Sequence, residues 1–334
     1  MSTAVYNQNY KRSVNKAAIP TCNIMGVDIA AVDMQWLLNY LGDNVAKLSG
    51  DYMCVSNVHT TVTAYEDEEY RKVQNGGIMA IPDGGPLSSV GQRRGFKNMK
   101  RTTGPSLMGE VFEISVSKGY RHYFYGSTEE TLEKLRKVLE EKYPGIEIAG
   151  MYSPPFRPMT EEEDKTIVEQ INETDPDFVW IGLGAPKQEK WMAAHQGRVN
   201  GLMVGVGAGF DYHAGNIDRA PEWMQKCNLE WVYRLMQDPK RLLGRYWHTN
   251  TRFIWDIQPN IPLRNILRIQ PHDLLKIRNI TPTTNLPHPG NSRLNGNPCS
   301  VMQLILLQLI RQNRSGTHQT HGPSLCQLRN VNAK

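Results

Sequence analysis

The sequence predicts an α/β fold, in which helices cover both faces of a Rossmann-like, mostly parallel sheet, with a helical appendage at the C-terminal side. Between about residues 24 and 210, short apolar runs alternate with longer segments of helical spacing, as expected for a parallel sheet. From Pro221 onward this alternation stops, and two consecutive helices are expected, with a break near Asp238–Pro239. After about Pro259 the sequence is polar and largely without periodicity, which predicts a poorly ordered tail.

Six apolar runs bounded by turn residues are predicted to form the strands. They lie at residues 52–57, 78–83, 121–127, 146–152, 177–184 and 201–207. The segments between them are predicted helices: Asp33–Leu48, Thr60–Gln74, Pro105–Lys118, Thr128–Tyr143, Thr160–Asn172 and Pro186–His195. Acidic residues follow Thr128 and Thr160, where they favour the positive end of the helix dipole.

These patterns divide the chain into four parts. We expect an N-terminal extension at 1–22, an α/β domain at 23–220, a helical appendage at 221–258 and a poorly ordered tail at 259–334.

The composition indicates an ordinary globular protein. Of the 334 residues, 40% are apolar, which is enough for a sizeable core. The net charge of +5 arises largely beyond Asp273, where seven basic residues and no acidic ones occur, so it does not indicate a nucleic-acid partner. The five cysteines are scattered without a CxxC pair, and there is no signal peptide or apolar stretch long enough to span a bilayer. We therefore expect a cytoplasmic protein.

Polar residues follow three of the predicted strands. Asn57, Asp83 and the pair Gln188–Glu189 come where ligands bind in a doubly wound sheet. Asp83 precedes Gly84–Gly85, a turn that a substrate can approach closely; the alternative is a turn aspartate that caps the next helix. For the pair at 188–189, the alternative is an ordinary strand-to-helix turn whose polar residues face water.

Two further motifs argue against a dinucleotide and a metal. The segment "GVGAGF" at 205–210 does not fit GxGxxG in register and follows the last strand instead of the first. Asp175 and Asp177 have the DxD spacing of many metal sites, but they precede a strand, at the wrong edge of the sheet. We therefore predict no cofactor and no metal site.

Several motifs together resemble one family. "PDGGPL", "KRTTGPSLM", "GLGAPKQEKW" and "GVGAGFDYHAGNIDRAPEWMQKCNLEWVYRLMQDPKRLLGRY" resemble the WecG/TagA/CpsF family of bacterial glycosyltransferases, over about residues 23–255. The resemblance implies transfer of an N-acetylhexosamine, typically N-acetylmannosamine, from UDP to a polyprenyl diphosphate-linked sugar. It further implies inversion without a metal, at the inner face of the plasma membrane, in the synthesis of teichoic acid, enterobacterial common antigen, capsule or exopolysaccharide.

The resemblance also assigns roles to residues of this chain. It places the catalytic base on Asp83 and substrate contacts on Asn57, Arg101 and Gln188, while Val55 stands where many members have threonine. The membrane-docking appendage of the family completes its site with arginines, which correspond to Arg234, Arg241 and Arg245. Glu189 and Asp211, which lie in the same motifs, complete the predicted substrate-binding set. On one continuous helix the three appendage arginines would share a face.

The expected partners are therefore a UDP-N-acetylhexosamine donor, a polyprenyl diphosphate-linked acceptor, the membrane surface and a second copy of the chain as a homo-oligomer. Two other functions stay open. A UDP-sugar epimerase or dehydrogenase would need bound NAD and an N-terminal GxGxxG, which "IMGVDIAAVD" does not supply. A non-catalytic polyprenyl-lipid-binding assembly protein would bind the carrier without releasing UDP.

Overall fold

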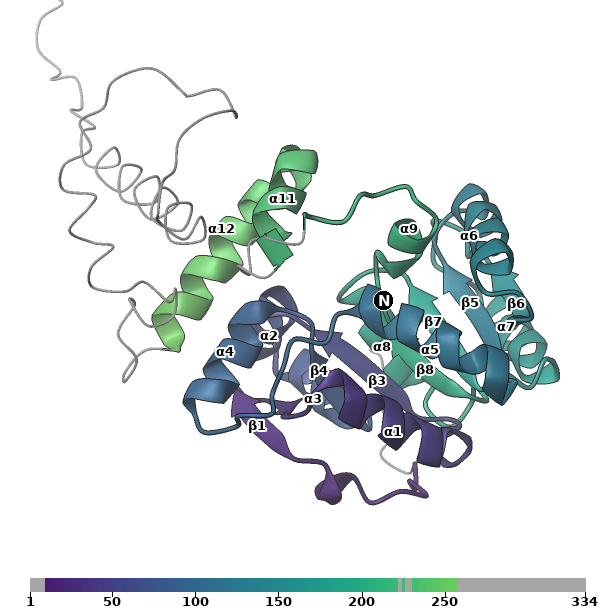
Figure 1. Ribbon diagram of the computed structural model, residues 1–334, viewed down its shortest axis with the longest axis horizontal. Coiled ribbons are helices and arrows are strands. Elements are labelled where there is room, and N and C mark those ends of the chain that lie inside the picture. The colour runs from purple at the N-terminus through teal and green to yellow at the C-terminus, as the bar shows by residue number, and fades with distance from the viewer. Residues whose placement is uncertain (1–9, 222–223, 226–229, 258–334) are drawn as a thin grey trace, which may run out of the picture. The chain divides into compact units, whose positions relative to one another are not determined.

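The computed structural model describes residues 10–221, 224–225 and 230–257, all of which belong to one compact unit, Met1–Pro262. The predicted tail at 259–334 lies outside the described residues. The centre is an eight-stranded sheet in the order β1-β2-β4-β3-β8-β7-β5-β6 (Figure 1). Its strands are β1 Thr21–Ile24, β2 Val27–Ala30, β3 Tyr52–Ser56, β4 Met79–Pro82, β5 Arg121–Gly126, β6 Glu147–Tyr152, β7 Phe178–Gly182 and β8 Leu202–Gly205. Among the described strands, β1 and β2 pair antiparallel and all the other pairs are parallel, so the predicted α/β fold with a mostly parallel sheet is confirmed.

Helices surround this sheet. They are α1 Met34–Asn44, α2 Val58–Glu66, α3 Glu68–Gly76, α4 Gly85–Arg93, α5 Gly104–Lys118, α6 Glu129–Lys142, α7 Glu161–Glu173, α8 Lys187–Ala194, α9 Gly209–His213, α11 Glu230–Gln237 and α12 Pro239–Asp256. Short 3-10 turns occupy Lys16–Ala18 and Val45–Leu48. All six predicted strands form, and the boundaries of most predicted helices agree within a few residues.

Three features differ from the sequence prediction. The β1–β2 hairpin was not predicted, because each strand has only four residues and the turn at Met25–Gly26 carries no strong signal. Helix α4 is not among the predicted helices, because Gly84, Gly85 and Pro86 indicate a turn at its start. The single helix predicted at Thr60–Gln74 is divided into α2 and α3 at Asp67, whose carboxylate caps α3 by accepting a hydrogen bond from Tyr70 N–H.

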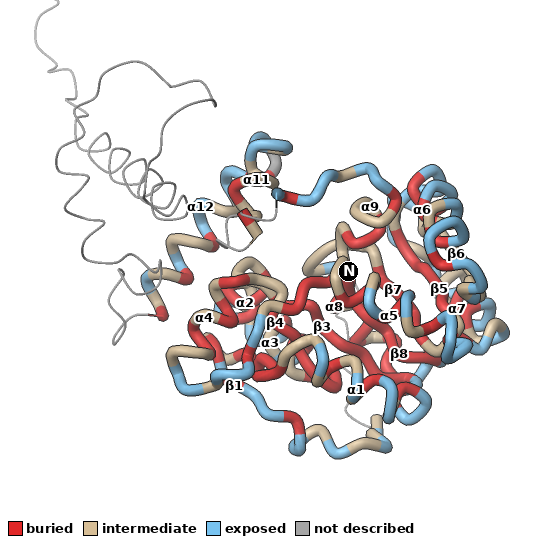
Figure 2. The backbone as a smooth tube through the Cα atoms, in the orientation of Figure 1, coloured by how far each residue is buried: buried red, intermediate tan, exposed pale blue. Residues whose placement is uncertain are grey.

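The core lies in two layers, one on each face of the sheet. Alternate residues of each central strand enter opposite layers: Phe178 and Trp180 of β7 face α5 and α9, whereas Val179 and Ile181 face α7 and α8. Figure 2 shows the central strands buried and the outer faces of the helices exposed. This burial on both faces explains why the strands read as continuous apolar runs.

The chain beyond Glu230 forms two helices, α11 and α12, which are separated at Asp238 as Pro239 predicted. Trp231 and Tyr246 pack edge to face with ring centroids 5.9 Å apart, so the two helices contact each other. Helix α12 also lies along α2, where Arg252 approaches the carboxylate of Glu66 and the ring of Tyr65. In the described part of the chain, no helix is long and apolar enough to span a membrane.

His122 makes the stability of the fold depend on pH. The ring is fully buried among aromatic side chains and accepts a hydrogen bond from Trp180 Nε1 at 3.1 Å. Burial lowers the pKa of His122 from 6.5 to about 3. The unfolded chain therefore binds a proton that the folded chain excludes, and this site reduces stability as the pH falls from about 6.5 towards 3.

We expect His122→Gln to weaken this pH dependence, because the amide can accept the Trp180 hydrogen bond but does not titrate. Urea unfolding between pH 7 and pH 4 measures the effect as the slope of the unfolding free energy against pH. The exposed His248, 61% accessible, provides the control. His248→Gln should leave the slope unchanged, and an equal slope for wild type and His122→Gln would contradict the assignment.

Candidate active site

The carboxyl ends of four neighbouring parallel strands, β4, β3, β8 and β7, bring the predicted site loops together. Asp83 follows β4, Asn57 follows β3 and Gln188 lies just beyond β7. The segments after β8 lead into α9, which carries Asp211. The sheet topology therefore gathers residues that are distant in sequence at one edge.

Asp83 is fixed at this edge by two hydrogen bonds. Its backbone N–H donates to Ser56 O at 2.8 Å, and one carboxylate oxygen, Oδ1, accepts from Gly104 N–H at 3.3 Å. Gly104 is the first residue of α5, so the carboxylate lies at the positive end of that helix. Among the described residues no donor engages Oδ2. That oxygen is available to a substrate hydroxyl.

Asp83 does not cap α4, but it does bind the first N–H of α5, the next helix that the sequence predicted, at Pro105–Lys118. Helix α4 has Gly84 as its N-cap residue, with no side-chain capping bond. Asp83 instead bonds to the start of α5, which is 21 residues further along the chain.

Arg101 connects Asp83 with α11. Its Nε donates to Asp83 O at 3.3 Å, and its Nη2 pairs with the carboxylate of Glu230. Burial lowers the pKa of Arg101, Asp83 acts against this, and the positive charges of Arg219 and Arg234 lower the pKa further. Each cause indicates that the guanidinium is enclosed and close to other charges.

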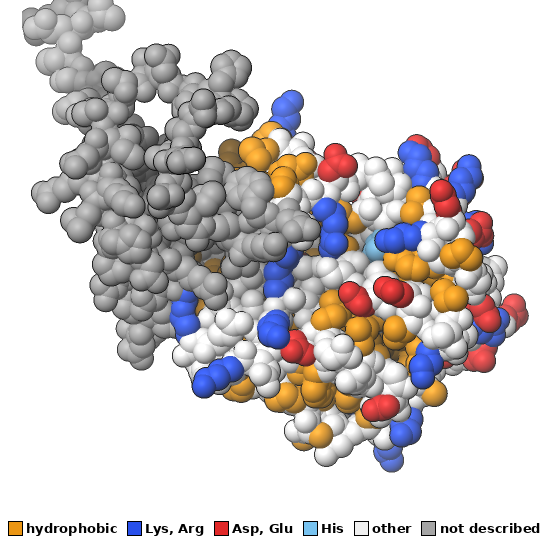
Figure 3. Space-filling view, viewed as in Figure 1, with side chains coloured by type: hydrophobic (Ala, Val, Ile, Leu, Met, Phe, Trp, Pro, Cys, Tyr) orange, Lys and Arg blue, Asp and Glu red, His pale blue; other side chains and the backbone are white. Residues whose placement is uncertain are grey.

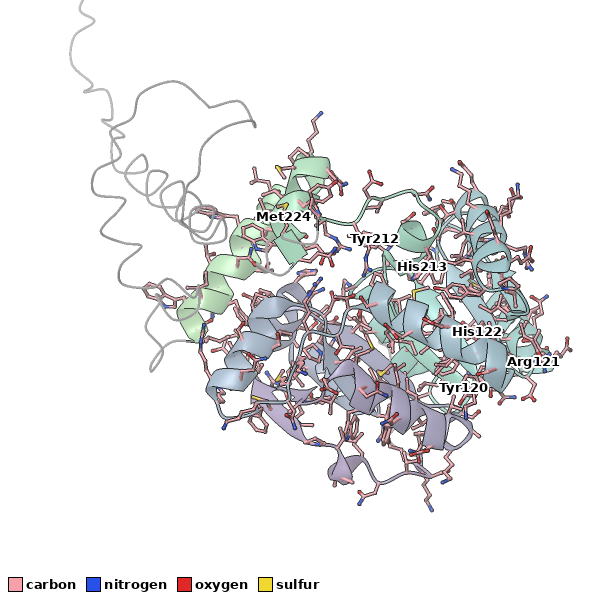
Figure 4. All side chains as sticks on the ribbon, viewed as in Figure 1. Tyr120, Arg121, His122, Tyr212, His213 and Met224 are labelled. Atoms are coloured by element: carbon pink, nitrogen blue, oxygen red, sulfur yellow. The ribbon has the colours of Figure 1, made fainter. Side chains whose placement is uncertain are left out.

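A second arginine, Arg234 of α11, contacts Tyr212. Arg234 Nε donates to Tyr212 OH at 2.6 Å, and the guanidinium lies over the Tyr212 ring, 5.0 Å from its centroid. Figure 4 shows Tyr212 on the side of α9 that faces α11. Burial acts to lower the pKa of Arg234, but Tyr212 and Asp83 outweigh it, and the net direction is upward. The predicted arginine thus lies in the electrostatic field of the predicted base.

A third arginine belongs to the same group. Arg219 donates to Ser106 Oγ at 2.9 Å, in the first turn of α5. We call Arg101, Arg219 and Arg234 the arginine cluster. Figure 3 shows basic side chains gathered on this face, with acidic side chains beside them. Clustered guanidinium groups, which bind phosphate oxygens in pairs, form a site for an anion.

Sequence reasoning missed three members of this arrangement: Arg219, Tyr212 and Glu230. All three lie inside the long motif that carried the family resemblance. Tyr212 is adjacent to the predicted Asp211, and Glu230 is one turn before the predicted Arg234. Their chemistry was visible in the sequence, but their convergence on Asp83 depends on how α11 packs.

Gln188 and Glu189 are buried behind this face. Their exposed fractions are 4% and 0%. Gln188 Oε1 accepts hydrogen bonds from Gly184 N–H and Gly207 N–H at 3.1 and 3.0 Å, while its Nε2 donates to Glu189 Oε1 at 2.9 Å. The alternative of water-facing turn residues is therefore wrong. Direct contact of either side chain with substrate stays a prediction.

The glycines after β8 accommodate Gln188. A Cβ atom at Gly205 would lie 3.0 Å from Gln188 Nε2 and 2.8 Å from Met192 Cε, and Gly207 has a left-handed φ of 54°. The motif thus allows an amide side chain to bind the backbone closely.

The other predicted residues have local roles. Asn57 caps α2 by accepting from Thr60 N–H at 3.2 Å, and Asp211 Oδ1 accepts from Asn216 Nδ2 at 3.2 Å. Val55, at the position of the usual threonine, is buried in β3. The side chains of Arg241 and Arg245 lie outside the described residues. Substrate contacts by these residues stay predictions, and the break between α11 and α12 means that Arg234 and Arg241 do not share one continuous helix.

Asp175 and Asp177 form a turn before β7, as predicted. Asp177 Oδ2 accepts from Arg121 N–H at 2.8 Å, and Asp175 has a φ of 45°. Within the described residues, no three His, Cys, Asp or Glu side chains are grouped to hold a metal ion. A metal-independent reaction stays a prediction.

A parallel α/β sheet with an anion site at its carboxyl edge is an architecture of nucleotide-sugar enzymes. Residues 22–265 match the model of the glycosyl transferase WecG/TagA/CpsF family, and the chain therefore belongs to this family of glycosyltransferases. Two relatives are named N-acetylglucosaminyldiphosphoundecaprenol N-acetyl-beta-D-mannosaminyltransferase. The one from Staphylococcus aureus (strain MW2) is 27% identical over 66% of this chain and 86% of the relative. The one from Bacillus subtilis (strain 168) is 30% identical over 58% and 76%.

The ion pair between Arg101 and Glu230 is expected to hold the start of α11 in place. We expect Glu230→Gln to accelerate amide hydrogen exchange in residues 231–237 roughly tenfold, since a hydrogen bond between charged groups contributes on the order of 1.5–3 kcal/mol. Hydrogen–deuterium exchange with mass spectrometry measures this. Glu169→Gln, which removes a surface carboxylate near Lys165, is the control and should leave α11 unchanged. Unchanged exchange in Glu230→Gln would show that this pair does not hold the helix.

Proposed function

We propose that this protein transfers an N-acetylhexosamine, N-acetylmannosamine in the first instance, from UDP to a polyprenyl diphosphate-linked sugar. By analogy with the named relatives, the acceptor is N-acetylglucosaminyldiphosphoundecaprenol and the product is an intermediate of teichoic acid or a related surface polysaccharide. The observation that carries the proposal is the carboxylate of Asp83, whose Oδ2 has no donor among the described residues and which lies in the electrostatic field of Arg101 and Arg234.

Asp83 acts as the general base in this proposal. Its Oδ2 accepts the proton of the acceptor hydroxyl as the hydroxyl oxygen attacks the anomeric carbon. The bond between that carbon and the UDP oxygen breaks, and its electron pair leaves with UDP. Because attack and departure occur on opposite faces of the sugar ring, the anomeric configuration inverts.

The arginine cluster stabilises the departing diphosphate. Negative charge develops on the UDP oxygens in the transition state, and prearranged cations are most effective where water is excluded. Arg101 and Arg234 are both substantially buried, and the charge of Asp83 acts to raise the pKa of each. The same positive charges therefore stabilise the anionic leaving group, without a metal ion in the proposed reaction.

A lipid-linked acceptor places the reaction at the inner membrane surface. On α11 and α12, Met236, Leu243, Trp247 and Trp255 are exposed, at 62%, 58%, 47% and 74%. Exposed aromatic and apolar side chains on amphipathic helices suit an interfacial position. We therefore propose peripheral membrane association through these helices.

Asp83→Asn should abolish transfer, lowering kcat by about 10²–10⁴-fold, because an amide cannot accept the proton. UDP-sugar binding should be largely retained, since the arginine cluster is intact. UDP release and mass analysis of the lipid product measure transfer, and calorimetry measures donor binding. Asp175→Asn, the same change at an exposed aspartate on the opposite edge, should behave as wild type. Wild-type turnover by Asp83→Asn would remove Asp83 from the mechanism, whereas acceptor binding by the wild type without UDP release would indicate a lipid-binding protein.

Transfer should continue in EDTA at the wild-type rate, because the arginine cluster takes the place of a divalent cation. The measurement is UDP release before and after chelation, with added Mg²⁺ or Mn²⁺ as the control. A strict requirement for either ion would overturn the metal-free mechanism and make the Asp175–Asp177 turn the candidate metal site.

A further inference from the structure

The amide of Gln188 is held in one orientation. Its oxygen accepts the N–H groups of Gly184 and Gly207, and its nitrogen donates to Glu189 Oε1. Turning the amide over would set its NH₂ group against two N–H donors and its oxygen against a carboxyl oxygen. In a buried position such mismatches are costly, so the orientation is determined by its neighbours.

This amide joins two loops at the candidate site. Gly184 follows β7 and Gly207 follows β8, and these strands are neighbours in the sheet. A single oxygen atom accepts from both loops, so a rotation of the side chain would remove both bonds and leave Gly207 N–H with its longer bond, 3.3 Å, to Ile181 O. Glu189 provides the partner that prevents this rotation.

A second set of buried polar groups lies behind Asp83. The hydroxyl of Tyr70 accepts from Gln74 Nε2 at 2.9 Å. Gln74 Oε1 in turn accepts from Ser56 Oγ at 2.6 Å, and Ser56 O accepts from the backbone N–H of Asp83 at 2.8 Å. Buried hydrogen bonds thus lie behind the loops after β7 and β8 at Gln188, and behind the loops after β3 and β4 at Ser56. Polar groups within each such set reinforce one another.

We propose that Glu189 is a positioning residue for glycosyl transfer: its buried carboxyl group fixes the Gln188 amide and, through it, the loops after β7 and β8. This inference rests on the proposed function for the reaction that it supports. Because the Glu189 side chain has no exposed surface, this proposal has it act through Gln188, whereas the sequence predicted a direct substrate contact. Burial raises the pKa of Glu189.

Glu189→Ala and Glu189→Gln separate this role from simple packing. The alanine variant leaves Gln188 Nε2 without an acceptor, so exchange of the Gly184 and Gly207 amides should accelerate about tenfold or more, and kcat should fall by a similar factor with a smaller change in KM. The glutamine variant retains an acceptor oxygen and should remain within about threefold of wild type in both measurements, well below a tenfold loss. Amide exchange resolved at single residues by NMR supplies the first readout.

Asp51→Asn is the matched control. Asp51 is also a buried carboxyl group, 1% exposed, but it lies before β3 at the opposite edge and binds Arg12 and Gln196. Its substitution reports general destabilisation, which should lower the melting temperature without selectively accelerating Gly184 and Gly207. Faster amide exchange at Gly184 and Gly207 in Glu189→Ala but not in Asp51→Asn supports the positioning role, whereas equally faster exchange in both variants overturns it.

The pH dependence of stability tests the raised pKa of Glu189. Because burial raises this pKa above its usual 4.5 in the folded state, the unfolded chain loses the Glu189 proton first as the pH rises. Wild type should therefore lose stability relative to Glu189→Gln as the pH increases above about 4.5. A stability difference that does not change between pH 4 and pH 8 would contradict the raised pKa.

Different results would disprove the proposed function and the positioning role of Glu189. If wild type releases no UDP with any donor of a UDP-N-acetylhexosamine panel, the proposed function fails. If wild type is active and Glu189→Ala keeps both its kcat and its wild-type exchange at Gly184 and Gly207, the positioning role fails. Activity and exchange that are equally impaired in Glu189→Gln and Glu189→Ala would also overturn it.

Discussion

The hydrogen bond from Asp83 N–H to Ser56 O, the last residue of β3, continues the pairing of β3 and β4 one residue beyond the end of β4. It determines where Asp83 leaves the sheet and therefore where its carboxylate lies. The segment at 101–104 depends on the same point, because Thr102 N–H donates to Pro82 O at 2.7 Å and Gly104 N–H donates to Asp83. The start of α5 and the position of Arg101 thus follow from the end of one buried strand.

Much of the fold was predictable because a doubly covered parallel sheet has a simple sequence pattern. Each central strand is buried on both faces and reads as a continuous apolar run, so β3, β4, β5, β7 and β8 were all found. The edge strand β6 is only partly buried and was also found. The β1–β2 hairpin was missed because four-residue strands are too short to establish a period. Helix α4 was missed because Gly84, Gly85 and Pro86 indicate a turn locally, although proline in the first helical turn is also favourable.

The site was predictable only in part, since sequence identifies chemistry at strand ends but not the packing of distant segments. Asp83, Asn57 and Gln188 were found because topology alone brings the carboxyl ends of their strands together. Tyr212 and Glu230 were missed because their roles arise from contacts with Arg234 and Arg101, more than 20 residues away. A polar residue after a strand can face solvent or, like Gln188, form buried hydrogen bonds. Which of the two occurs depends on the packing of distant segments, which no local sequence pattern determines.

The charges of the site interact with one another before any substrate binds. Arg101 and Arg234 repel each other, yet Asp83 and Tyr212 act against this repulsion and Glu230 pairs with Arg101. In the proposed reaction a diphosphate that binds Arg101 competes with Glu230 for the guanidinium, so donor binding and the attachment of α11 are linked. The loop that follows β8 takes part in both arrangements, because Gly207 binds Gln188 and the loop leads into α9, where Tyr212 accepts from Arg234. The buried amide of Gln188 therefore supports the same segment that presents a partner to the arginine cluster.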